Sequence, residues 1–109
     1  MGEAVVHYPH LARCSPGLTT MTAAVEAWGR ARWPGSRVIH EMRVGGCRLD
    51  LAFVQPTHLI GVELKSERDT LDRLDTQIRH FCREIPEMWV AVAPKWVPRL
   101  DDLRFSVGR

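Results

Sequence analysis

The chain has 109 residues, of which 45% are apolar, so it is long and apolar enough for one folded domain and too short for two. Fifteen Lys and Arg nearly balance thirteen Asp and Glu, and the formal net charge of +2 neither requires nor excludes a nucleic-acid partner. No apolar run approaches the ~18 residues of a membrane span, and three widely spaced cysteines do not make a disulfide framework. We therefore expect a cytoplasmic protein with no membrane partner.

The first third of the chain predicts an irregular arm followed by one helix. Residues 1–18 have no sustained hydrophobic period and end near a Pro-Gly pair, which favours a mostly irregular segment. A helix is predicted from Thr19 or Thr20, either of which can cap it, to about Trp33, before Pro34-Gly35. Its apolar stripe recurs at helical spacing and comprises Met21, Ala24, Val25 and Trp28.

Three strands are predicted next, joined by tight turns. They cover Arg37–Val44, Cys47–Val54 and His58–Lys65, with Gly45-Gly46 forming the first turn and Gln55 to Thr57 the second. Alternation places Leu49, Leu51 and Phe53 on one face of the second strand and Asp50 on the other. In the third strand, Glu63 and Lys65 share a face because strand side chains alternate with period two.

The last third predicts a helix, a buried strand and a C-terminal loop or short helix. The helix is expected from about Asp69, a plausible N-cap, to Glu84, because its apolar residues follow helical spacing. The apolar run Met88–Ala93 predicts a strand, and 94–109 a loop with a short helix. The order α-β-β-β-α-β predicts an α/β fold with a mixed four-stranded sheet flanked by helices, all in a single domain.

Two carboxylates and one amine are expected at one end of this sheet. Asp50 and Glu63 lie on neighbouring strands, and Lys65 follows Glu63 on the same face. Paired carboxylates are an ordinary seat for Mg²⁺, which takes few protein oxygens and can activate a bound water. A lysine beside them can orient that water or stabilise charge on a phosphate. Glu26 reaches the same place if the first helix packs over this face.

The pattern "RLD", twelve residues, then "ELK" resembles the signature of the PD-(D/E)XK nuclease superfamily, with Asp50, Glu63 and Lys65 at the matching positions. The following "KSERDTLDRLDTQ" is similar to the stretch found in minimal single-domain phage and bacterial nucleases of this type, including VRR-NUC and Holliday-junction-resolvase-like enzymes. Leu49 stands where the signature has proline. The resemblance covers roughly residues 20–93 and implies a restriction-endonuclease-like αβββαβ core.

The resemblance also implies a function and a set of site residues. It implies a Mg²⁺-dependent DNA endonuclease, with Mn²⁺ able to substitute, acting in repair, recombination or phage genome processing in a bacterial or phage-infected cytoplasm. Asp50, Glu63 and the Leu64 carbonyl would bind the metal, Glu26 or Glu41 would complete the acidic set, and Lys65 would act on the attacking water. Gln77 matches a polar residue that such enzymes often carry on the helix after the third strand. Four residues are expected to contact DNA: Arg48, Ser66, Arg68 and Arg73.

Three alternatives stay open at this point. The first is a non-catalytic nucleic-acid-binding or inhibitory module that retains the nuclease fold, and the second is a structural subunit of a larger complex. The third is that the helix arginines form a solvated face with the neighbouring Asp and Glu residues, an interpretation that the charge pattern favours over DNA contact. Because specific DNA contact generally buries ~1,000 Å² or more, we also expect a homodimer, with the arm before Leu18 or the tail after Pro94 in its interface.

Overall fold

A computed structural model describes residues 2–7 and 18–102 of the chain. Five strands, two α-helices and one 3₁₀-helix occupy these residues. In chain order they are β1 (Gly2–His7), α2 (Leu18–Arg32), β2 (Arg37–Val44), β3 (Cys47–Gln55), β4 (His58–Lys65), α3 (Leu74–Phe81), β5 (Glu87–Val92) and η1 (Pro94–Asp102). The bounds of β2, β3, β4 and β5 lie within a residue or two of the predicted ones.

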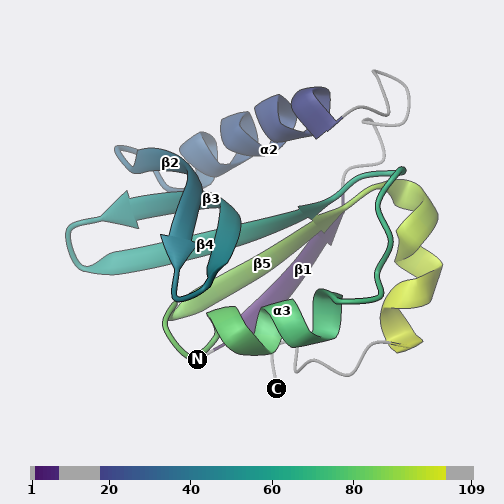
Figure 1. The fold of residues 1–109 in the computed structure, drawn as a ribbon. Coiled ribbons are helices and arrows are strands. Elements are labelled where there is room, and N and C mark those ends of the chain that lie inside the picture. The colour runs from purple at the N-terminus through teal and green to yellow at the C-terminus, as the bar shows by residue number, and fades with distance from the viewer. Residues whose placement is uncertain (1, 8–17, 103–109) are drawn as a thin grey trace.

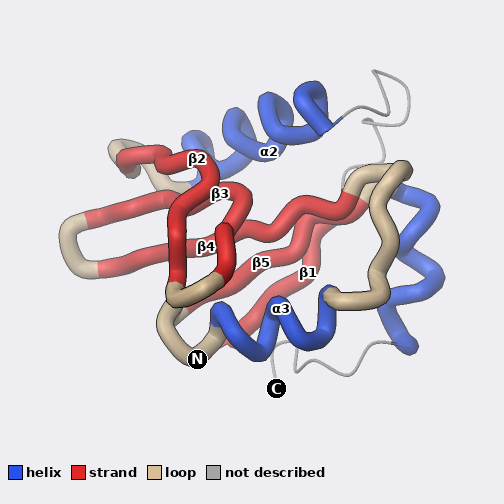
Figure 2. The backbone as a smooth tube through the Cα atoms, in the orientation of Figure 1, coloured by secondary structure: helices blue, strands red, loops and turns tan. Residues whose placement is uncertain are grey.

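The strands form one mixed sheet in the order β1-β5-β4-β3-β2. The tight turns make β2, β3 and β4 an antiparallel meander, whereas the crossover through α3 makes β5 parallel to β4. The helices α2 and α3 cover opposite faces of the sheet (Figures 1 and 2). The prediction of a small α/β fold with a mixed, helix-flanked sheet is confirmed.

The prediction of an irregular N-terminal arm is wrong for residues 2–7. These residues form β1, which pairs in parallel with β5 from Gly2–Glu87 to His7–Val92 and makes the sheet five-stranded rather than four-stranded. The segment is short and has no clear alternation, so only the free edge of β5 supplies the hydrogen bonds that make it a strand. The remainder of the predicted arm lies outside the described residues.

The helix after β4 is shorter than the predicted range of Asp69 to Glu84. The structure has α3 only at Leu74–Phe81. Asp69 is not its N-cap: the Asp69 carboxylate accepts a hydrogen bond from the Ser66 backbone N–H at 2.6 Å. Asp side chains often satisfy nearby backbone groups in this way, and such bonds compete with helix formation. The residues after β4 therefore form a turn before the helix begins.

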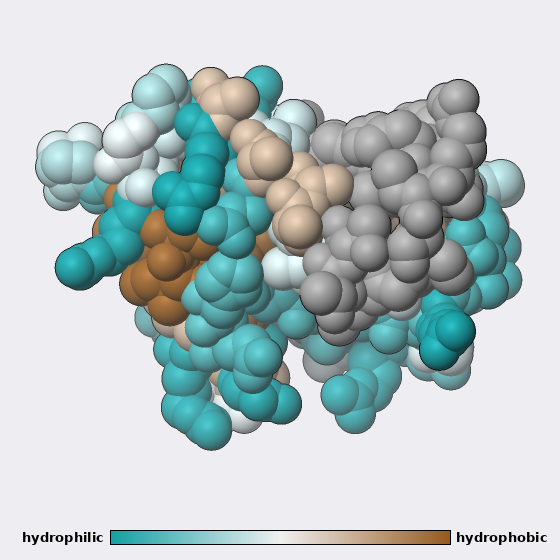
Figure 3. Space-filling view, turned by 90° about the horizontal axis from the view of Figure 1, so that it is seen from above, coloured by the Kyte–Doolittle hydropathy of each residue, from teal (hydrophilic) through white to brown (hydrophobic). Residues whose placement is uncertain are grey.

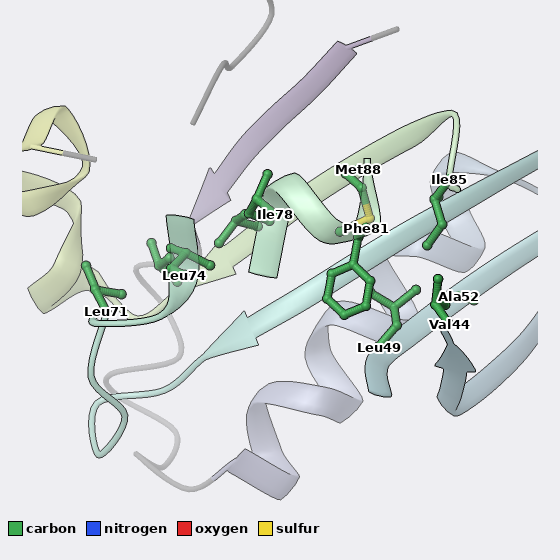
Figure 4. Packing of buried hydrophobic residues seen from close by; sticks show 11 residues of the cluster. Val44, Leu49, Ala52, Leu71, Leu74, Ile78, Phe81, Ile85 and Met88 are labelled. Atoms are coloured by element: carbon green, nitrogen blue, oxygen red, sulfur yellow. The ribbon is translucent and has the colours of Figure 1, made fainter. Parts of the chain in front are cut away.

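The core consists of two apolar clusters, one on each face of the sheet. Met21 and Val25 of α2 pack over Leu51, Phe53 and neighbouring residues of β4. The other cluster lies under α3, where Phe81 points toward the sheet (Figure 4), and its buried members are Val44, Leu49, Ala52, Leu71, Leu74, Ile78, Phe81, Ile85, Met88, Val90 and Val92. Burial of these side chains supplies most of the driving force for folding.

A bend in the β2–β3 hairpin corrects one part of the predicted face assignment. Leu49 belongs to the cluster under α3, whereas Leu51 belongs to the cluster under α2, so the expected alternation breaks at Asp50. On the neighbouring strand, Glu41 has a φ of 53°, a left-handed conformation unusual for a residue with a side chain. Both strands turn sharply here, and the tip of the hairpin approaches α3 (Figures 1 and 2).

The surface on the α2 side is mixed in character. Hydrophilic side chains cover much of its described part, and an apolar area lies at the left of the view (Figure 3). Among residues 2–7 and 18–102, no helix has the length and apolarity needed to cross a bilayer.

Candidate functional site

The bend opens a gap between β3 and β4 at the position of Asp50. The backbone pairing of these strands runs from Gln55–His58 to Leu51–Val62. One residue further, the Asp50 carboxylate accepts a hydrogen bond from the Leu64 backbone N–H at 2.8 Å. A side-chain oxygen thus takes the place of a strand carbonyl, and this holds Asp50 at the point where the two strands diverge.

Glu63 lies beside Asp50 and is buried. Its side chain is on the α3 face, the residue is 3% exposed, and its Oε1 lies 3.5 Å from the Asp50 backbone nitrogen. Burial, followed by the negative charge of Asp50, raises the pKa of Glu63 to about 8. Burial also raises the pKa of Asp50. Two carboxylates in this position cannot both ionise without cost unless a cation joins them.

Lys65 completes the predicted group of three. It follows Glu63 by two residues at the end of β4 and is half-buried. Its carbonyl accepts a hydrogen bond from the Ala93 N–H at 2.9 Å, which fixes the strand end. The positive charge of Lys65 lowers the pKa of both carboxyl groups, in opposition to burial. The three side chains therefore share one electrostatic environment, as predicted from their spacing.

These three residues line a cavity of about 830 Å³ that lies between the bent hairpin and α3. Its walls carry carboxylates, three cationic side chains and several neutral polar groups. The lining residues are Glu41, Gly46, Cys47, Arg48, Asp50, Glu63, Leu64, Lys65, Asp69, Arg73, Thr76, Gln77 and His80. A cavity lined by a neighbouring pair of carboxylates and by two arginines suits a ligand that combines a divalent cation with an anionic group.

The two candidates for a further carboxylate occupy different places. Glu26, on α2, lines a second cavity of about 430 Å³ together with Asp50, and Glu41 lines both cavities. The Glu26 carboxylate accepts hydrogen bonds from Arg30 at 2.7 Å and from His40 at 2.8 Å, and the Arg30 bond lowers its pKa. Of these two glutamates, only Glu41 therefore lines the same cavity as Glu63.

Neither candidate is joined to the acidic pair in this conformation. Glu41 forms an ion pair with Arg48 at 2.9 Å, and Glu26 is held by Arg30 and His40. In the part of the chain that the structure describes, no three His, Cys, Asp or Glu side chains form a metal-ligand cluster. Asp50 and Glu63 are the two carboxylates that the fold brings together.

The predicted DNA contacts and Gln77 divide into two groups. Arg48, Arg73 and Gln77 line the large cavity, and the Gln77 Oε1 is buried without a hydrogen-bond partner. Ser66 is buried, and its hydroxyl accepts a hydrogen bond from the Arg68 N–H at 3.3 Å, so it supports the turn after β4. Arg68 is exposed in that turn and does not line the cavity.

Sequence reasoning missed His80, which connects α3 to the hairpin. Its Nε2–H donates to the Val44 carbonyl at 2.8 Å, and its ring lies against Gly45, at the hairpin tip. This contact joins α3 to the hairpin tip, and His80 lines the cavity between the two elements. The signal was present, because His80 follows Gln77 by three residues and lies on the same side of a helix.

Fold and site together define a small α/β protein in which a bent hairpin and a helix enclose a buried glutamate, a half-buried aspartate and a lysine. The chain belongs to the family of bacteriophage P4 protein cII, whose model matches residues 27–103. The matched range contains Asp50, Glu63, Lys65 and Glu41, and it begins one residue after Glu26. Neither a curated protein nor a solved structure gives a match.

Proposed function

We propose that the protein is a Mg²⁺-dependent DNA endonuclease with a restriction-endonuclease-like core. The observation that carries the proposal is the placement of Asp50, Glu63 and Lys65 at the base of one cavity, where β3 diverges from β4. The order α2-β2-β3-β4-α3-β5 supports it, because it matches the order of elements in the αβββαβ core that the PD-(D/E)XK resemblance implies.

The acidic pair fits a hard divalent cation. Both carboxyl groups have raised pKa values because they are buried together, and a cation between them would relieve this cost. Asp50, Glu63 and the Leu64 carbonyl would hold Mg²⁺ or Mn²⁺, which keeps several waters as ligands. When bound, the ion would acidify a water and polarise the phosphodiester. Glu41 is the better placed of the two additional carboxylates because it shares the cavity with Glu63.

The remaining side chains of the cavity orient the substrate. Lys65 positions the attacking water and stabilises the negative charge that develops on the phosphate. Arg48 and Arg73 contact phosphate oxygens, for which the planar guanidinium offers two parallel donors. Gln77, which lines the cavity from α3, contacts the substrate.

A cleavage assay with matched variants tests this function. Purified protein is incubated with single-stranded, duplex, flap and junction DNA in Mg²⁺ or Mn²⁺. We expect the wild type to cleave at least one of these, and Asp50→Asn, Glu63→Gln and Lys65→Met each to lose cleavage. Lys95→Met is the control for loss of a lysine, because Lys95 lies over the Trp96 ring and outside the cavity. Circular dichroism spectra confirm that each variant is folded.

The outcomes separate the proposal from its alternative. Wild-type protein that cleaves none of the substrates, and whose Mn²⁺ binding by calorimetry is absent, would remove the proposal. Salt-dependent DNA binding in the same samples would then indicate a non-catalytic nucleic-acid-binding or inhibitory module.

A further inference from the structure

The hairpin bend places a strained glutamate directly across from Asp50. The register of β2 and β3 pairs His40 with Leu51 and Met42 with Leu49, so Glu41 lies opposite Asp50. Among the described residues, Glu41 is the only one other than glycine with a positive φ. The left-handed conformation costs free energy for a residue with a Cβ atom, and such strain is often found at functional positions. The bend therefore presents a further carboxylate, besides Asp69, at the cavity that Asp50 and Glu63 line.

Arg48 forms an ion pair with the Glu41 carboxylate. Its Nη1 lies 2.9 Å from the Glu41 Oε1, and the two side chains are 64% and 67% exposed. An ion pair this exposed is weak and exchanges readily for another partner. Both residues line the large cavity, so a phosphate that enters meets the guanidinium that neutralises Glu41. A phosphate accepts two charge-assisted hydrogen bonds from one guanidinium and competes well with a carboxylate for it.

We propose that Arg48 and Glu41 couple phosphate binding to cation binding at this site, which rests on the proposed nuclease function. A DNA phosphate takes Arg48 from Glu41, and the released Glu41 carboxylate turns toward Asp50 and Glu63. The acidic set then has a third member only when substrate is present. By thermodynamic reciprocity, the cation strengthens phosphate binding by the same factor. Arg48 is thus a positioning residue, because it determines whether the Glu41 carboxylate is free to join the cation.

Calorimetric titration with Mn²⁺ tests the coupling without relying on cleavage. We expect Arg48→Met to bind Mn²⁺ about fivefold or more tightly than the wild type in the absence of DNA, because Glu41 is released. Adding Glu41→Gln to Arg48→Met should remove this gain. Arg43→Met is the matched control: Arg43 lies across the hairpin from Arg48, is exposed and lines neither cavity. It removes the same charge without releasing Glu41, so its Mn²⁺ affinity should stay close to that of the wild type.

A second titration includes phosphorothioate DNA, which resists hydrolysis, in single-stranded and duplex forms. In the presence of whichever DNA form the wild type binds, its Mn²⁺ affinity should rise several-fold. The Mn²⁺ affinity of Arg48→Met should not rise further when DNA is added. The coupling would be overturned if Arg48→Met and Arg43→Met changed the Mn²⁺ affinity equally, or if Arg48→Met bound Mn²⁺ more weakly than the wild type. The proposed function would still stand if the wild type bound Mn²⁺ and cleaved DNA. Absence of Mn²⁺ binding by the wild type with and without DNA would overturn both.

Discussion

Replacement of Glu63 by glutamine should change how the stability of the protein depends on pH. The pKa of Glu63 is about 8 in the folded protein and 4.5 as the ordinary value expected in the unfolded chain. Between these values the folded state retains a proton that the unfolded state has released, so the free energy of unfolding falls as pH rises from about 4.5 to about 8. At 1.36 kcal/mol per pKa unit, the full effect corresponds to roughly 5 kcal/mol, shared between Glu63 and its neighbour Asp50.

Glu63→Gln keeps the shape of the side chain and cannot ionise. We therefore expect the variant to equal or slightly trail the wild type near pH 5 and to be more stable at pH 8 by a few kcal/mol. Mn²⁺ at 100 times its dissociation constant should return about 2.7 kcal/mol to the wild type at pH 8, if the proposed cation site is present. The variant should gain little from the metal, because it lacks one of the two carboxylates.

Urea unfolding monitored by tryptophan fluorescence measures these differences. Trp28, Trp33 and Trp89 are in mutual ring contact and pack against the core, so their emission reports global unfolding. Glu84→Gln is the control, because Glu84 is exposed just beyond α3. At each pH, the free energy of unfolding of the wild type is subtracted from that of the variant. The difference no longer contains the contribution of ionisable groups that both proteins share. A stability difference for Glu63→Gln that does not change between pH 5 and pH 8 would refute the reasoning.

Three further predictions concern the hairpin tip, DNA binding and assembly. Gly45→Ala should lower the free energy of unfolding by about 1–2 kcal/mol, because an alanine at φ 61° is strained; Gly46→Ala, whose φ is not positive, should have little effect in the same urea assay. Arg73→Met should weaken DNA binding for all sequences and reduce the slope of log affinity against log salt concentration by about one. Arg79→Met should leave this slope unchanged, because the Arg79 guanidinium pairs with Asp75. Equal slopes for the two variants would argue against a phosphate contact by Arg73. Light scattering should give twice the mass of the chain, and a monomer at assay concentration would contradict the expected dimer.

Local sequence patterns determined most of the central elements. The alternation and turn residues of 37–65 predicted three strands, which the structure has at Arg37–Val44, Cys47–Gln55 and His58–Lys65. They also predicted that Asp50, Glu63 and Lys65 would meet, because a short turn forces neighbouring strands to pair and a period of two keeps Glu63 and Lys65 on one face. These features depend on residues close in sequence, so sequence periodicity records them.

Only the tertiary structure decided the features that depend on distant partners. Residues 2–7 become a strand because β5, more than eighty positions later, offers a free edge. The helix after β4 begins later than predicted because the Asp69 carboxylate accepts a hydrogen bond from the Ser66 N–H instead of capping the helix. The bend at Glu41 and Asp50 likewise has no period in the sequence. It follows from packing the hairpin tip against α3, where His80 holds Val44, and it turns Leu49 away from the face of Leu51. The sequence alone therefore predicted which side chains gather. The tertiary structure decided that all three line one cavity with Glu41, whereas Glu26 shares a second cavity with Asp50 but not with Glu63 or Lys65.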